Sequence, residues 1–164
     1  MQSLNRILHA ILTWFSIGVF TILIIDVVLG VGSRYLVGNQ IRWTEELATF
    51  LLVWLVFCGA AIAYRDNAHL GINLLMTKLH PGAAKKLRIV ALIIVLFFTL
   101  AVMVVGGIQL TMERLHFGQM MSTLGIQKAW LYLSVPFSGT FIALFNIEML
   151  INTIQSKTEG SADA

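Results

Sequence analysis

Long apolar stretches alternate with short polar segments along the chain. The stretches occupy residues 7–33, 47–64, 89–112 and 129–147, and Asp26 is the only Asp, Glu, Lys or Arg within them. A helix rises about 1.5 Å per residue, so about 20 apolar residues cross the ~30 Å hydrocarbon core of a bilayer. The pattern therefore predicts four transmembrane helices. We place them near residues 10–33, 44–64, 86–112 and 129–152.

These helices assign the chain to the all-α integral membrane class. In lipid the backbone must satisfy its own hydrogen bonds, and a closed barrel would need alternating segments of about 10 residues, which the sequence lacks. We expect one four-helix transmembrane domain over residues 1–155 and a disordered tail over 156–164. The first apolar stretch is longer than the apolar core of a cleavable signal peptide, so we expect it to remain in the protein.

The polar connection between the second and third spans contains a shorter amphipathic segment, residues 70–79. Four of its apolar residues, Ile72, Leu75, Met76 and Leu79, follow the i, i+3, i+4, i+7 spacing of one helix face. Such a segment is too short to cross the bilayer, so it predicts a helix lying flat in the membrane interface.

Composition excludes a soluble protein. Apolar residues make up 58% of the 164 residues and charged residues 12%, and the mean hydropathy is +0.86, whereas a soluble domain carries about 25% charged residues. The low charge also excludes an intrinsically disordered chain. Cys58 is the single cysteine, so the chain can form neither an internal disulfide nor a multi-cysteine metal site.

The distribution of Lys and Arg predicts the orientation. Four spans place both termini and the 65–88 connection on one side, with seven basic residues against four on the other. The seven are Arg6, Arg65, Lys78, Lys85, Lys86, Arg88 and Lys157, and the four are Arg34, Arg42, Arg114 and Lys128. The positive-inside rule therefore puts both termini in the cytoplasm. Loop charges also account for the net charge of +3, so we expect no nucleic-acid partner.

Asp26 is the one acidic residue inside the four apolar stretches. It precedes Arg34 by eight residues, about 12 Å along a helix, and a carboxylate at the centre of a span costs about 3 kcal/mol on insertion scales. It either handles a proton or cation, or it is hydrogen-bonded to a neighbouring helix or drawn toward the nearby non-cytoplasmic face. The other three apolar stretches contain no acid that could relay a proton to it, which favours the second interpretation.

The second span begins with a recognisable helix start. Thr44 can cap the free amides, Glu45 and Glu46 suit the positive helix end, and Trp43 fits the aromatic belt of a membrane protein. Arg42 could pair with either carboxylate. Adjacent residues on a helix point about 100° apart, so the two glutamates do not form a catalytic acid pair. They serve either the electrostatics of the helix start or the docking of a partner protein.

Neither a nucleophile–base pair nor a phosphate-binding loop nor a cluster of metal ligands is present in the sequence, so we expect no enzyme and no cofactor. None of the four histidines lies mid-span, which argues against a haem held by two histidines in the bundle. His69 follows Arg65 by four residues, so the two share a helix face at the end of the second span.

Several of these segments together resemble one transporter family. The run Trp43-Thr-Glu-Glu-Leu-Ala48 is followed by Cys58-Gly-Ala-Ala-Ile-Ala-Tyr-Arg65 and then by His69, with Arg34-Tyr35 before them and Pro136 after. This combination is similar to the small, DctQ-like membrane subunit of tripartite ATP-independent periplasmic (TRAP) transporters. The four-span plan fits that subunit over nearly the whole chain.

The resemblance implies a function in transport without catalysis. Subunits of this kind sit in the bacterial inner membrane beside a large permease subunit, which carries the substrate and sodium sites and moves as an elevator. A periplasmic binding protein delivers an organic acid such as a dicarboxylate, keto acid or sialic acid. The small subunit is a scaffold, with Trp43, Glu45, Glu46, Arg65 and His69 as structural or partner-contact positions and phospholipid around it.

Two other interpretations of the sequence remain. A self-contained, proton-coupled four-span exporter would use Asp26, although such exporters have shorter loops than the 65–88 connection. A quinone-linked membrane anchor is the third hypothesis. Conversely, spans so poor in polar groups make a weak transport path on their own, which favours a supporting subunit.

Overall fold

The computed structural model describes residues 2–36, 38, 41–67 and 81–159, and their secondary structure is helical apart from one isolated bridge between Met120 and Gln127. Four helical stretches are long and apolar enough to cross a membrane, which confirms the predicted fold class. The elements are α1 (Gln2–Leu36), α2 (Arg42–Asn67), α4 (Pro81–Phe98), the π-helix η1 (Thr99–Gly106), α5 (Gly107–His116), α6 (Ala129–Tyr132) and α7 (Ser134–Glu159).

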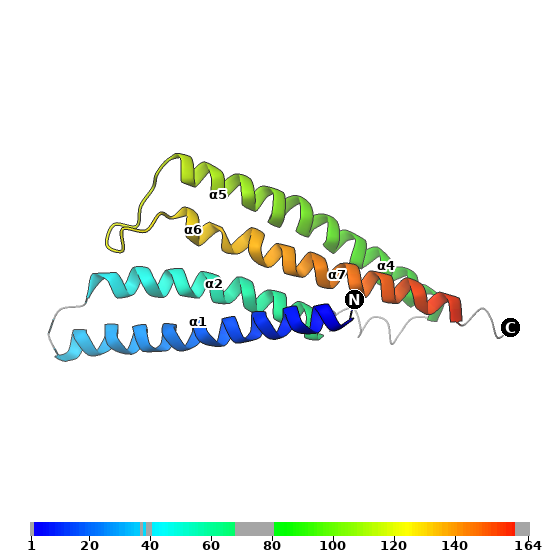
Figure 1. Ribbon diagram of the computed structural model, residues 1–164, viewed down its shortest axis with the longest axis horizontal. Coiled ribbons are helices and arrows are strands. Elements are labelled where there is room, and N and C mark those ends of the chain that lie inside the picture. Colours follow the sequence, from blue (N-terminus) through cyan, green and yellow to red (C-terminus); the bar gives the residue numbers. More distant parts are fainter. Residues whose placement is uncertain (1, 37, 39–40, 68–80, 160–164) are drawn as a thin grey trace.

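The helices form two antiparallel pairs (Figure 1). Helices α1 and α2 make one hairpin, and the continuous rod α4–η1–α5 runs back along α6–α7. Both termini lie at one end of the molecule, and the α1–α2 and α5–α6 connections lie at the other, which we call the loop end. This arrangement is the one that an even number of spans requires.

The helices extend beyond the predicted spans. Apolar patterning marks only the part that can lie in hydrocarbon, whereas polar residues at the interface continue the same helix. The backbone remains helical through Glu159, four residues into the segment expected to be a tail. The remaining residues 160–164 and the predicted interfacial helix at 70–79 lie outside the described residues.

Helix α7 is the central element of the bundle. In the most apolar window of the α6–α7 span 44% of the residues are buried, against 11% to 28% for the other three spans. Its Phe145 and Ile142 pack against Cys58 and Ala61 of α2 and Leu12 of α1 in one apolar cluster. The small residues of α2 that turn inward are Cys58 and Ala61.

Two other small residues of α2, Gly59 and Ala63, face outward. A Cβ atom added at Gly59 would meet nothing within 4 Å, and Ala63 is exposed. The close approach between helices is made by Gly107 and Gly139. A Cβ at Gly107 would lie 2.8 Å from Cδ of Pro136, and one at Gly139 would lie 2.8 Å from Cβ of Met103. Glycine is therefore required for the contact between α7 and the third span.

The fourth span is interrupted close to Pro136. Helix α6 ends at Tyr132 and α7 begins at Ser134, so the break falls at Leu133, three residues before Pro136. Pro136 has no N–H to give to the carbonyl of Tyr132, four residues earlier. The irregularity therefore appears on the N-terminal side of the proline, in the turn whose hydrogen bond is lost.

Candidate functional site

Glu46 fastens the two hairpins together at the loop end. Its carboxylate accepts hydrogen bonds from Oγ of Ser122 at 2.7 Å and from the backbone N–H groups of Thr123 and Leu124 at 2.9 and 3.0 Å. These donors belong to the loop 117–128, which joins α5 to α6. One charged acceptor at the start of α2 thus holds a connection of the other helix pair, more than 70 residues later in the chain.

The loop is folded so that these donors point at Glu46. Its ends are tied by the amide of Lys128 to the carbonyl of Gln119 at 2.8 Å, and its tip by the amide of Met121 to the carbonyl of Ile126 at 2.8 Å. Gly125 has a φ of 65°, a left-handed conformation that suits glycine and closes the turn. The anion site for Glu46 is therefore built into the loop backbone.

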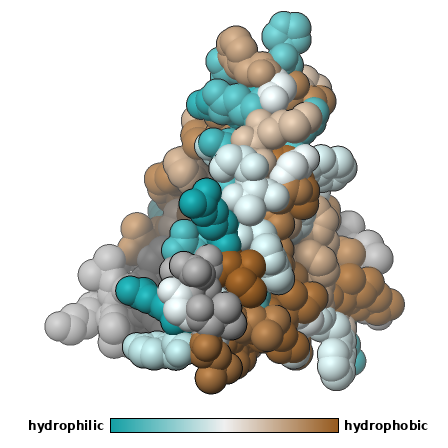
Figure 2. All heavy atoms as spheres, turned by 90° about the vertical axis from the view of Figure 1, so that its left-hand side faces the viewer, coloured by the Kyte–Doolittle hydropathy of each residue, from teal (hydrophilic) through white to brown (hydrophobic). Residues whose placement is uncertain are grey.

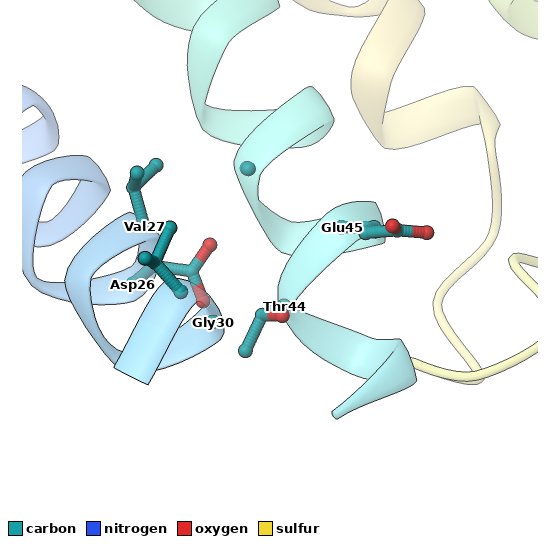
Figure 3. A pocket seen from close by; sticks show the side chains of 7 residues that line it. Asp26, Val27, Gly30, Thr44 and Glu45 are labelled. Carbon is teal, nitrogen blue, oxygen red and sulfur yellow. The ribbon is translucent and has the colours of Figure 1, made fainter. Parts of the chain in front are cut away.

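Glu45 and Trp43 face outward near Glu46. Glu45 is exposed, and in Figure 3 its side chain points away from α1. Trp43 retains 38% of its surface. The expected N-cap at Thr44 is not formed, because the helix already begins at Arg42 and the Thr44 hydroxyl donates to the carbonyl of Ile41 at 2.7 Å.

Figure 2 shows this loop end face-on. Hydrophilic residues run through the middle of the face, and hydrophobic residues flank them. A polar centre between apolar flanks is what a membrane protein presents where its helices leave the hydrocarbon.

Arg65 lies at the opposite end of α2. Its guanidinium stacks over the ring of Phe145 on α7, 5.6 Å from the ring centroid. Beside it, His9 of α1 approaches Asp66 at 3.1 Å. These contacts join α1, α2 and α7 near the end of α2 that lies away from Glu46. The predicted face-sharing partner of Arg65, His69, lies outside the described residues.

The sequence signature is therefore not one site. Glu46 and Arg65 are 19 residues apart on one helix, which corresponds to about 29 Å. Each anchors a different end of the bundle: Glu46 binds the α5–α6 loop, and Arg65 stacks on α7. The signature marks the two ends of helix α2, which contact different parts of the bundle.

Sequence reasoning missed the polar contacts inside the bundle. Asn146, fully buried on α7, donates through Nδ2 to the hydroxyl of Tyr64 at 2.6 Å. Asn5 of α1 donates to the carboxylate of Glu148 on α7. An asparagine inside an apolar span was the available signal for such a contact, because an amide in lipid needs a partner.

Asp26, the acid that the sequence places inside an apolar stretch, is strongly buried in the structure. Its side chain is 2% exposed, and neither carboxylate oxygen has a hydrogen-bond partner among the described residues. It lines a cavity of about 120 Å³ between α1 and α2, together with Gly30, Thr44 and Ala48 (Figure 3). The expected hydrogen bond to a neighbouring helix is not formed, although the carboxylate does face that helix.

Within the part of the chain that the structure describes, no three His, Cys, Asp or Glu side chains are grouped to hold a metal ion. The fold and the two anchored ends define a multi-pass membrane protein whose polar contacts serve to hold helices and a loop in place.

Comparison with known proteins identifies the family. Residues 23–156 match the DctQ component of the tripartite ATP-independent periplasmic transporters, and the chain belongs to this family. It is a small permease subunit of a TRAP transporter, as the signature around Trp43–His69 indicated.

Named relatives carry different substrate labels. The sialic acid TRAP transporter small permease protein SiaQ of Vibrio cholerae is 26% identical over 94% of this chain and 88% of its own length. A putative TRAP transporter small permease protein of Haemophilus influenzae is 27% identical over 94% of both chains. The C4-dicarboxylate TRAP transporter small permease protein DctQ of Vibrio cholerae is 29% identical over 55% of this chain and 38% of its own length.

Proposed function

We propose that this subunit is a static, non-enzymatic scaffold in a sodium-coupled importer of organic acids in the bacterial inner membrane. It braces a large permease subunit, which holds the substrate and sodium sites and performs the movement. A periplasmic binding protein supplies the substrate. Both termini face the cytoplasm, and the loop end, with Trp43, Glu45 and Glu46, faces the periplasm.

The hydrogen bonds formed by the polar groups within the spans support this function. Several buried hydroxyls donate to carbonyls of their own helices. Examples are Ser16 to Leu12 and Thr153 to Met149, at 2.8 and 2.7 Å. Hydroxyls engaged in this way do not line a hydrophilic path, which a transported ion or acid would need.

The low burial of the helices within this chain supports the scaffold role as well. The window of the α4–η1–α5 span is only 11% buried within this chain, and that of α2 only 17%. Such surfaces are covered by lipid or by another membrane protein. A subunit with little burial of its own has most of each helix available for a larger partner.

The class of substrate follows from the relatives. Sialic acid and C4-dicarboxylates, named for two of them, are both carboxylic acids. We therefore propose an organic acid, bound by the other two components. The alternative of a self-contained exporter is not favoured, because the family match covers most of the chain.

Reconstitution tests this function. Proteoliposomes receive the small subunit, the large subunit encoded with it, or both, together with the cognate binding protein and an inward sodium gradient. We expect uptake of a radiolabelled organic acid only with both subunits. Robust accumulation by the small subunit alone would refute the scaffold role.

A further inference from the structure

The cavity at Asp26 is the feature that the contacts within this chain leave unexplained. Asp26 and Gly30 of α1 and Thr44 and Ala48 of α2 line its interior, where small side chains leave the space open. Figure 3 shows the Asp26 carboxylate turned toward α2 across this space. Its rim includes Val27 and Val31, 46% and 52% exposed, and the exposed Glu45. The cavity therefore opens on the outer face of the α1–α2 hairpin.

A carboxylate in this position requires a counter-group. It lies ten residues from the end of α1 at Leu36, about 15 Å along the helix, beside Thr44 in the first turn of α2. Ionisable groups at such depth are paired or face a polar cavity. The described residues of this chain supply no partner to either oxygen.

The lining indicates what kind of group fits. A bare cation would need several oxygen ligands, whereas inside the cavity the side chains offer only the Asp26 carboxylate and the Thr44 hydroxyl oxygen. A cationic side chain brings its own donors and needs only acceptors. Asp26 supplies two acceptor oxygens inside, and Glu45 adds a second negative charge at the rim.

We propose that the Asp26 cavity receives a lysine or arginine side chain of the large permease subunit, so that the ion pair forms within the membrane when the two subunits assemble. This inference rests on the proposed function and adds a contact site to it. The outer face of α1–α2 near Asp26 becomes a docking surface, and pairing with the correct subunit becomes a condition for burying this charge.

Replacing Asp26 tests the pairing through two measurements, the melting temperature of the isolated chain and the recovery of the large subunit. The first should stay the same or rise, and the second should fall. In Asp26→Leu the cavity is filled and the charge removed, so we expect the isolated chain in detergent to melt at an unchanged or higher temperature. Recovery of the co-expressed large subunit with the tagged chain should fall at least tenfold. Asp26→Asn should also lower the recovery of the large subunit. Glu113→Gln, which removes an exposed carboxylate from α5, is the matched control and should change neither quantity.

Carboxyl labelling provides a test on the unaltered protein. Dicyclohexylcarbodiimide, an apolar reagent, should modify Asp26 in the isolated chain, as located by peptide mass spectrometry, and should fail to do so in the complex. Where the reagent does activate the carboxyl in the complex, a lysine in the cavity would displace dicyclohexylurea and leave an amide cross-link instead of the reagent adduct, whereas an arginine would give protection alone.

The outcomes separate this inference from the function on which it rests. Full recovery of the large subunit by Asp26→Leu, or equal labelling of Asp26 with and without that subunit, overturns the pairing and leaves the scaffold role standing. A lowered melting temperature together with lost recovery assigns Asp26 to folding and also overturns it. Failure of the wild-type chain to bind the large subunit refutes both proposals.

Discussion

At the residue scale, two acidic residues near the loop end have opposite surroundings. Glu46 accepts three hydrogen bonds from the loop 117–128, whereas Asp26 has none from the described residues. Both were visible in the sequence as acids at or in an apolar span. Their roles were not, because hydrogen-bond partners from another helix pair become neighbours only on folding.

Glu46→Gln should loosen the loop. Replacing one carboxylate oxygen by an NH₂ group removes an acceptor that the loop amides share and the charge that strengthens these bonds. We expect deuterium exchange across residues 117–128 to speed up several-fold at the amides of Thr123 and Leu124. Glu45→Gln, one residue earlier and pointing elsewhere, is the control. Unchanged exchange in Glu46→Gln would contradict the anchoring role.

Tyr64→Phe should destabilise the bundle by about 0.5–2 kcal/mol. The substitution leaves the buried Nδ2 of Asn146 without the hydroxyl that it contacts at 2.6 Å. Thermal unfolding in detergent measures the effect. Tyr35→Phe removes the same group from a side chain that is 84% exposed. The melting temperature of this control variant should therefore match that of the wild type.

At the element scale, packing depends on which face of each helix carries small residues. Gly107 and Gly139 allow α7 to approach the third span, whereas Gly59 has open space beyond it. A sequence read alone treats these glycines as equivalent packing signals. Which of them meets a neighbour depends on helix rotation, and rotation is set by contacts along the whole span.

Gly107→Ala should cost about 1–3 kcal/mol, the usual penalty for overpacking. The new methyl would lie 2.8 Å from Cδ of Pro136, in a rigid ring that cannot move aside. Gly59→Ala in the isolated subunit should be neutral or slightly stabilising, because alanine favours the helix and meets nothing. Equal melting temperatures for the two variants would contradict the packing described.

At the scale of the whole molecule, four spans bring both termini to one end and both short connections to the other (Figure 1). Little of each span is buried, and α7 provides most of the internal contact. The chain is therefore built to present apolar surface. That design suits a subunit whose remaining neighbours are lipid and a larger membrane protein.

Cysteine labelling can fix the orientation. The native Cys58 is fully buried, so the wild-type chain should not react with a membrane-impermeant maleimide. Gln119→Cys in the loop should react in intact spheroplasts, because positive-inside counting places that loop in the periplasm. Gln155→Cys near the end of α7 should react only after permeabilisation. The reverse pattern would invert the proposed topology.

The sequence by itself determined the number of spans, the fold class and the family. Hydrophobic length is a local property that decides whether a helix can span the bilayer, and the Trp43–His69 signature is one short segment of the sequence. Only the tertiary structure decided that Glu46 holds the α5–α6 loop, that α7 is central and that Asp26 faces a cavity. The physical reason is that apolar residues cover nearly every face of these helices, so periodicity cannot specify their rotation, and rotation decides which side chains meet.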